Sequence, residues 1–310
     1  MLKKSLSLIL ICVLIFAVGC TKAPQIDENK TDIVCTNFAT FDWVRNITRG
    51  VEGMDVSLLG GGQDLHSFQP GAKDIADIHN SKMVICLGGQ SDLWIEDVEK
   101  NGEKTLALFD AVGRENLIIP NHDHHEGHHH SDQEFDEHIW LSLKMAKVCV
   151  EEICEKLCSI DPDNEEIYRA NTESYCKELD ALDIKYTEAV EDSESRTVVF
   201  ADRYPFAYMM RDYDIECFAA FDGCSADTDA TFETVLELAG AVKKYNKKSV
   251  ATLEGTNSQI VIAINNALGD AVVNSAQMNS MQTMLKQNAE KESYIDIMEK
   301  NLESLKMALE

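Results

Sequence analysis

The sequence has little positive charge and lacks clear motifs of hydrolytic enzymes. It has 28 Lys and Arg against 54 Asp and Glu, which gives a formal net charge of −26 at pH 7. Nucleic acids and anionic lipid surfaces are therefore poor partners, because both carry negative charge. There is no GxSxG and no paired-carboxylate motif, and the one HExxH match, over 125–129, lies inside a run of histidines that contains a glycine and has no helical pattern. A zinc hydrolase needs a general base beside its metal, so these absences argue against an enzyme.

The chain also has no CxxC pair among its ten cysteines, which argues against a thiolate zinc ribbon. Cys149, Cys154 and Cys158 lie on one stretch with a helical pattern, and we expect them to be packed thiols. Cys217 and Cys224 are close enough in sequence for a disulfide within a loop. The sequence leaves open whether that bond forms.

Long apolar runs are absent after the first twenty residues. A basic start is followed by an apolar run over 6–18, which is too short for a permanent membrane helix and is typical of a signal peptide. The small residues that end at Cys20 resemble the bacterial lipobox, in which the cysteine becomes the lipidated first residue of the mature protein. Ordinary secretion with cleavage elsewhere is the alternative. We expect a lipoprotein anchored by palmitate at the extracytoplasmic face of the cell membrane.

Histidines are concentrated in one segment, since seven of the nine lie within 121–138. Neutral imidazole suits zinc, copper and nickel, and the acidic residues between the rings add oxygen donors. The segment has no hydrophobic period, so we expect an exposed, mobile loop that captures metal. A polar surface loop with accidental histidines and an expression tag are the alternatives. The candidate metal ligands in this loop are His122, His124, His125, His128, His129 and His130.

Short apolar segments alternate with helical patterns along the rest of the chain, which predicts parallel α/β construction. We expect two Rossmann-like lobes with parallel sheets, joined by one long rigid helix, with a metal site in the cleft between the lobes. In the first lobe the expected strands are 32–41 (ending in a turn), 54–59, 83–87, 106–109 and 116–119, and the expected helices 42–48, 72–80 and 137–157. In the second, the expected strands are 197–200, 216–221, 249–253 and 270–274, and the expected helices 205–212, 232–245, 257–268 and 294–309.

The long helix, expected from about 165 to 190, carries an apolar stripe at helical spacing, which we interpret as packing. At ~1.5 Å per residue it is roughly 40 Å long. The stripe comprises Tyr168, Tyr175, Leu179, Leu182 and Tyr186. The predicted organisation is a lipoprotein signal peptide (1–19), a polar tether (20–31), an N-terminal metal-binding lobe (32–160) with the His-rich loop (121–131), a linking helix (161–193) and a C-terminal lobe (194–310).

Ligands of α/β sheets bind at the carboxyl ends of the strands. His66 follows the second expected strand, after a glycine-rich turn. Arg203 and Glu254 follow strands of the second lobe, and Asn274 ends a third. We therefore expect these four residues to face one cleft between the lobes. His79 lies outside any motif and is interpreted as an ordinary surface histidine.

Two segments resemble ligand motifs of the metal-binding subunits of bacterial ABC importers for zinc and manganese (cluster A-I). They are GQDLHSFQP over 62–70, which contains His66, and DEHIWLS over 136–142, which contains His138. The resemblance covers nearly the whole chain after Cys20. It implies that both histidines are metal ligands and that the long helix is a rigid linker.

The same resemblance implies a monomeric solute-binding lipoprotein that captures Zn²⁺ outside the membrane and delivers it to the permease and ATPase subunits of an importer. Imidazole donors favour zinc over manganese, because manganese prefers oxygen. The alternatives are a surface adhesin or a protein that binds a metal chelate, and a zinc hydrolase is less favoured. A cationic Arg203 in the cleft is compatible with an anionic chelate.

The second lobe departs from the family pattern. Arg203, in the segment ADRYPF over 201–206, falls on the third ligand position, and a guanidinium cannot ligate a metal. The fourth position, usually acidic, falls near Asn274. Glu254 is the best remaining acidic candidate, either as a ligand or as the partner of Arg203 in an ion pair, and we favour the ion pair. The missing donors would then come from loop histidines, with water completing the shell.

Overall fold

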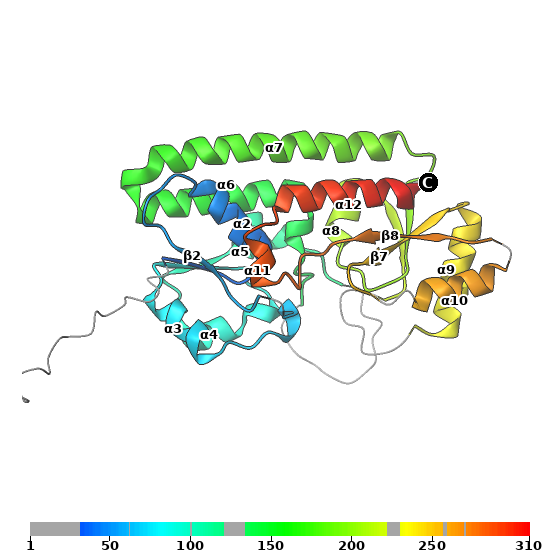
Figure 1. Cartoon of the computed structure of the whole chain (residues 1–310), viewed down its shortest axis with the longest axis horizontal. Coiled ribbons are helices and arrows are strands. Elements are labelled where there is room, and N and C mark those ends of the chain that lie inside the picture. Colours follow the sequence, from blue (N-terminus) through cyan, green and yellow to red (C-terminus); the bar gives the residue numbers. More distant parts are fainter. Residues whose placement is uncertain are drawn as a thin grey trace, which may run out of the picture. The chain divides into compact units, whose positions relative to one another are not determined.

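The computed structural model describes residues 32–61, 63–99, 101–120, 134–221, 230–256, 259–269 and 271–310. These residues form two four-stranded sheets in which every strand pairing is parallel (Figure 1). The prediction of a two-sheet parallel α/β fold is therefore confirmed. The first sheet has the order β2-β1-β3-β4 and the second β6-β5-β7-β8. The strands are β1 (Ile33–Cys35), β2 (Val56–Leu58), β3 (Met83–Cys86), β4 (Thr105–Ala107), β5 (Thr197–Phe200), β6 (Glu216–Ala219), β7 (Ser249–Leu253) and β8 (Asn274–Met278).

The inner strands are buried along their whole length, as expected for a parallel sheet that is covered on both faces. All residues of β1, β3, β5 and β7 are buried. Helices of the first sheet's part of the chain are α2 (Phe38–Ile47), α3 (Ala72–Asn80), α4 (Trp94–Val98), α5 (Leu108–Val112) and α6 (Leu143–Ile160). Those that follow β5 are α8 (Ala207–Asp212), α9 (Phe232–Lys244), α10 (Gln259–Leu268), α11 (Lys286–Ala289) and α12 (Tyr294–Leu309).

Helix α7 (Glu165–Glu191) lies between the two sheets in the sequence and is 27 residues long. It packs against α6, α2 and α12, and Figure 1 shows it running along α6 and α12. The predicted apolar stripe from Tyr168 to Tyr186 is buried, so its interpretation as packing is confirmed. The thiols Cys149, Cys154 and Cys158 are also buried, in α6.

The side chain of Asp42, in α2, also contacts residues of α7 and α12. Its Oδ2 accepts the Tyr294 N–H at 3.0 Å, at the start of α12, and the Asn46 side-chain amide at 3.1 Å, within α2. The Tyr175 hydroxyl of α7 lies 3.5 Å from the same oxygen. Burial raises the pKa of Asp42, although the hydrogen bonds from Tyr294 and Tyr175 oppose the rise. Because α12 also packs on β7 and β8, the C-terminal helix contacts both α7 and the second sheet.

Several element boundaries differ from those predicted. The first strand ends at Cys35 because Asn37 caps α2, its Oδ1 accepting the Thr40 N–H at 3.0 Å. The helix expected from 137 begins only at Leu143, because Ser142 caps it and a 3₁₀ turn (Ile139–Leu141) precedes the cap. The strand expected over 116–119 is wrong, since Arg114–Asn116 forms a 3₁₀ turn.

The last strand is displaced toward the C-terminus relative to the prediction. It spans Asn274–Met278 rather than 270–274, with Asn274 paired to Ser249 at its start. The carboxyl end of this strand is therefore Met278, and the segment that leaves the sheet there begins at Asn279. None of the helices in the described part of the chain is both long and apolar enough to cross a membrane.

Candidate metal centre

His66 lies on a short 3₁₀ turn, Leu65–Ser67, that follows β2. Asp64 caps this turn, its Oδ1 accepting the His66 N–H at 3.0 Å. The side chain of His66 is 35% exposed. Its Nδ1 lies 3.1 Å from Ser91 Oγ and 3.2 Å from Glu137 Oε2. Two acceptors therefore face the same ring nitrogen, which favours a proton on Nδ1.

Glu137 is held in place by Ser91. The backbone N–H of Ser91 donates to Glu137 Oε1 at 2.7 Å, and its hydroxyl donates to Oε2. Burial alone would raise the pKa of Glu137, but the bonds from His66 and Ser91 hold it below its ordinary value. A side chain at Gly89 would collide with this carboxylate, since a Cβ there would lie 2.2 Å from Oε1. Gly89 is thus required for Glu137 to reach His66.

His138 lies immediately before the turn Ile139–Leu141 and is almost completely buried, with 3% of its side chain exposed. Its Nδ1 donates to Asp136 Oδ1 at 2.8 Å, and its backbone N–H donates to the same oxygen at 2.9 Å. The backbone carbonyl of Asp136 accepts from the Tyr208 hydroxyl at 2.7 Å. A carboxylate behind each imidazole is the arrangement that orients histidine ligands in metal sites.

The structure brings the two predicted histidines together, with 3.4 Å between their Nε2 atoms. Two nitrogen ligands at the usual distances from a tetrahedral Zn²⁺ would be about 3.3 Å apart. Because each Nδ1 faces a carboxylate, a proton is favoured on Nδ1, and Nε2 is then the ring nitrogen suited to ligate a metal. The pair can therefore donate to one shared cation.

Gln282 is a residue of the site that sequence reasoning missed. Its side-chain Nε2 lies 3.3 Å from His66 Nε2 and closer still to His138 Nε2. Rotation of the amide by 180° exchanges its nitrogen and oxygen, which would direct Oε1 toward the same point. The expectation that Asn274 faces the site is wrong, because Asn274 starts β8 and lies at the opposite end of that strand. A polar segment follows the true end of β8 and contains Gln282. This segment was overlooked in the sequence because the strand was predicted to end at residue 274 rather than at Met278.

Glu254, at the carboxyl end of β7, holds the segment that carries Gln282. Its two oxygens accept the backbone N–H of Ser280 at 2.9 Å and the Ser280 hydroxyl at 2.7 Å. The Ser280 carbonyl accepts the Trp140 indole N–H at 2.9 Å. Burial raises the pKa of Glu254. Within the described ranges no three His, Cys, Asp or Glu side chains converge as a metal site, so Glu254 is not grouped with the two histidines.

Arg203 forms its ion pair with a residue other than the one expected, although its charge also lowers the pKa of Glu254 against the larger effect of burial. Its Nη1 lies 3.5 Å from Asp64 Oδ2, and the expected pair with Glu254 is absent among the described residues. Both oxygens of Glu254 are occupied by Ser280, whereas Asp64 directs its second oxygen toward Arg203. The ion-pair role predicted for Arg203 is retained, but with a carboxylate two residues before His66.

Some predicted residues lie outside the described part of the chain. They are Cys20, Cys224 and the six loop histidines His122, His124, His125, His128, His129 and His130. Cys217 is described, and burial raises the pKa of its thiol to about 12, against a hydrogen bond with Tyr204.

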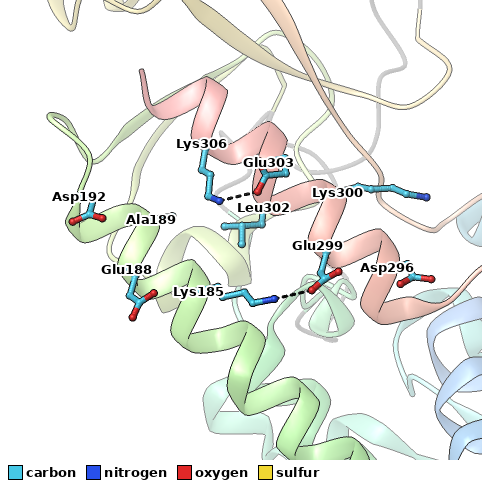
Figure 2. Close-up of a pocket in the computed structure, with 10 residues that line it drawn as sticks. All are labelled: Lys185, Glu188, Ala189, Asp192, Asp296, Glu299, Lys300, Leu302, Glu303 and Lys306. Atoms are coloured by element: carbon cyan, nitrogen blue, oxygen red, sulfur yellow. Dashed lines mark hydrogen bonds and ion pairs between the residues drawn. The ribbon is translucent and has the colours of Figure 1, made fainter.

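One groove lies away from the histidines. It has a volume of about 700 Å³, lies between α7 and α12, and is lined mostly by charged side chains (Figure 2). Two ion pairs cross or border it: Lys185 with Glu299 at 2.8 Å and Lys306 with Glu303 at 2.7 Å. Among the described residues, no group of three His, Cys, Asp or Glu side chains that could hold a metal ion is found in this groove.

Two parallel sheets, a long helix between them in the sequence and a pair of imidazoles backed by carboxylates define a two-lobed α/β protein with a candidate metal centre. The chain belongs to the family described as zinc-uptake complex component A, periplasmic (ZnuA), which it matches over residues 33–308.

Curated relatives agree with this assignment. The chain is 31% identical over 317 residues to the zinc-binding lipoprotein AdcA of Streptococcus pneumoniae, which covers 99% of this chain and 61% of that protein. It is 25% identical over 287 residues to the high-affinity zinc uptake system protein ZnuA of Bacillus subtilis, covering 91% of this chain and 88% of that protein. The chain thus spans about three fifths of the length of the AdcA proteins that it matches.

Solved structures share the fold. The metal-dependent lipoprotein YcdH of B. subtilis superposes with a TM-score of 0.72 at 23% identity, covering 90% of this chain and 99% of that one. The Zn(II)-bound ZnuA-like domain of S. pneumoniae AdcA gives a TM-score of 0.71 at 24% identity with the same coverage. A laminin-binding protein of Streptococcus agalactiae, described as having adhesin and metal-transporting activity, gives 0.74 at 20% identity over 90% of this chain and 100% of that one.

Proposed function

We propose that this protein is the extracytoplasmic solute-binding component of an ABC importer, and that it captures Zn²⁺ and delivers it to the permease. Its family is a component of zinc uptake rather than a family of enzymes. The observation that carries the proposal is the pair of Nε2 atoms 3.4 Å apart, each on a ring whose Nδ1 is held by a carboxylate. The partners would be the permease and ATPase subunits, and the binding protein would act as a monomer.

His66, His138 and the Gln282 amide oxygen would supply three donors. All three are neutral, so the charge of Zn²⁺ would be offset by Asp136 and Glu137, which lie behind the two imidazoles. A water molecule or one histidine of the loop would complete a tetrahedral shell. Two nitrogen donors favour zinc over manganese, because manganese prefers oxygen. In this proposal Glu254 supports the segment of Gln282 rather than ligating the metal.

The ligand assignment is tested by removing both imidazoles. The variant His66→Ala/His138→Ala should lose stoichiometric zinc binding in a competition titration with a chromogenic chelator, because the remaining amide is a weak donor. Gln282→Ala should bind zinc roughly tenfold more weakly, which corresponds to ~1.4 kcal/mol. His79→Ala is the matched control, since it removes an exposed histidine outside the site. Wild-type affinity in the double variant would refute the assignment.

The histidine-rich segment over 121–131 would serve as a capture loop that raises the local supply of zinc to the site. Its closely spaced imidazoles are suited to transient binding of transition metals. Deleting 121–131 should slow zinc loading in a stopped-flow assay while leaving the far-ultraviolet circular dichroism spectrum unchanged. Loss of the folded spectrum on deletion would contradict a role limited to capture.

The N-terminal segment would place the protein at the membrane. We infer lipidation of Cys20 after removal of a signal peptide over 1–19, with 20–31 as a polar tether. Relatives named as zinc-binding lipoproteins support this location. Metabolic labelling with palmitate should mark the wild-type protein and not Cys20→Ser, and equal labelling of the two would exclude this anchor.

A further inference from the structure

Arg203 lies in the part of the chain that follows β5, and its ion-pair partner lies in the other lobe. The distance from its Nη1 to Asp64 Oδ2 is 3.5 Å, across 139 residues of sequence. Asp64 precedes the His66 turn, which follows β2 of the first sheet. The pair therefore connects a segment of the second sheet directly to the turn that carries one of the two imidazoles.

The carboxylate of Asp64 makes two connections at once. Its Oδ1 accepts the backbone N–H of His66 at 3.0 Å, while its Oδ2 faces Arg203. The Ser67 hydroxyl donates to the Asp64 carbonyl at 3.2 Å and closes the same turn. Displacing the Asp64 side chain would thus loosen the backbone at His66.

The backbone of Arg203 is held in place within the second lobe by hydrogen bonds of Asp202. Asp202 is buried, and its Oδ1 accepts the Arg203 N–H at 2.8 Å. Its Oδ2 accepts the Leu253 N–H at 3.1 Å, at the end of β7. The backbone of Arg203 is therefore tied to the central strands of the second sheet, and its side chain extends from there to Asp64.

The two histidines differ in how firmly they are enclosed. The His138 side chain is 3% exposed, whereas that of His66 is 35% exposed. His66 also sits on a three-residue 3₁₀ turn, which has few internal hydrogen bonds. The position of His66 consequently depends more than that of His138 on contacts made by neighbouring residues such as Asp64.

We propose that Arg203 is a positioning residue, which joins the lobes through Asp64 and holds the His66 turn in its zinc-binding position. The inference rests on the proposed function, because it requires zinc at His66 and His138. The ion pair slows zinc release by opposing two movements, separation of the lobes and displacement of the turn. Arg203 cannot itself touch the metal, since a guanidinium is always protonated.

The test is a double-mutant cycle on zinc release. Arg203→Met removes the charge, and Asp64→Asn keeps an oxygen for the His66 N–H while removing the negative charge. Each single variant should release zinc about three- to fivefold faster in a stopped-flow chelator assay, the range for a partly exposed ion pair. The double variant should release zinc no faster than the singles, because each removes the same interaction.

The salt dependence of zinc release distinguishes a positioning role of Arg203 from a general loss of structure. Salt screens partly exposed charges, so zinc release from the wild type should accelerate with added salt, and release from Arg203→Met should not. Arg203→Lys should restore most of the salt dependence. Lys185→Met is the control, because it removes an exposed ion pair with Glu299 in the groove of Figure 2 and should leave release unchanged.

The outcomes are distinguishable. If the wild type binds no stoichiometric zinc, the proposed function fails and the inference fails with it. If the wild type binds zinc but Arg203→Met shows the wild-type release rate and salt dependence, the inference alone is overturned. Additive effects in the double variant would also overturn it, since they would mean that Arg203 and Asp64 act separately.

Discussion

Asp92 is a buried carboxylate one residue after Ser91, which contacts both His66 and Glu137. Its Oδ2 accepts the backbone N–H groups of Leu87 and Gly88. Burial, together with the nearby charge of Glu137, raises the pKa of Asp92 to about 6, against the lowering effect of the two hydrogen bonds. The folded protein therefore binds this proton more tightly than the unfolded chain does.

That difference predicts the sign of a pH effect on stability. The ordinary pKa of an aspartate is about 4, so the contribution of Asp92 is fully present below pH ~4 and is lost as the pH rises to about 6. The loss is of order 3 kcal/mol. Asp92→Asn does not titrate and keeps an acceptor for both N–H groups. Its stability relative to the wild type should increase by about this amount between pH 4 and pH 7.

Urea denaturation of the zinc-free proteins across this pH range measures the difference directly. The two stability curves should diverge as the pH rises. Parallel curves would contradict a raised pKa for Asp92.

The site residues themselves show what local sequence can specify. His66 and His138 were found because each lies in a short motif, and the structure brings their rings together. Gln282 was missed because the end of β8 was predicted too early, and Asp64 was missed because its role depends on Arg203, which is far away in the sequence. Their places depend on where β8 ends and on which carboxylate lies opposite Arg203.

Helix α7 was predicted from its own periodicity, and its apolar stripe is buried against neighbouring helices. Leu179 is 1% exposed in this interface, whereas Ile184 on the same helix is 56% exposed. Leu179→Ala should lower the free energy of unfolding by about 2–5 kcal/mol, because it leaves a cavity. Ile184→Ala should lower it by less than about 1 kcal/mol.

Chemical denaturation followed by circular dichroism measures both variants, and equal losses would show that burial does not decide the contribution of α7 side chains.

Element ends were less predictable than element types. Hydrophobic pattern marks the interior of a strand or helix, whereas caps such as Asn37 and Ser142 decide where a helix begins.

At the scale of the whole molecule, zinc would link segments that are far apart in the sequence. His66 and His138 precede α7, and Gln282 follows β8. A ligand that binds only the folded state stabilises it, by ~2.7 kcal/mol at a concentration one hundred times Kd. Zinc should therefore raise the unfolding temperature of the wild type and of His79→Ala, and a chelator should reverse the shift.

Differential scanning calorimetry measures these shifts. The His66→Ala/His138→Ala variant should unfold at the same temperature with and without zinc. An equal zinc-dependent shift in this variant would place the main site elsewhere in the chain.

The amino-acid sequence by itself determined the two parallel α/β sheets, the long helix between them and the choice of His66 and His138 as candidate ligands. Periodicity and short motifs are local properties, so they can be read without the structure. The tertiary structure alone decided that Arg203 pairs with Asp64, that Glu254 binds Ser280 and that Gln282 reaches the imidazoles. These contacts join residues 26 to 216 positions apart. Which carboxylate or amide lies within hydrogen-bonding distance at such separations depends on strand register and helix packing, and neither is encoded in a local pattern.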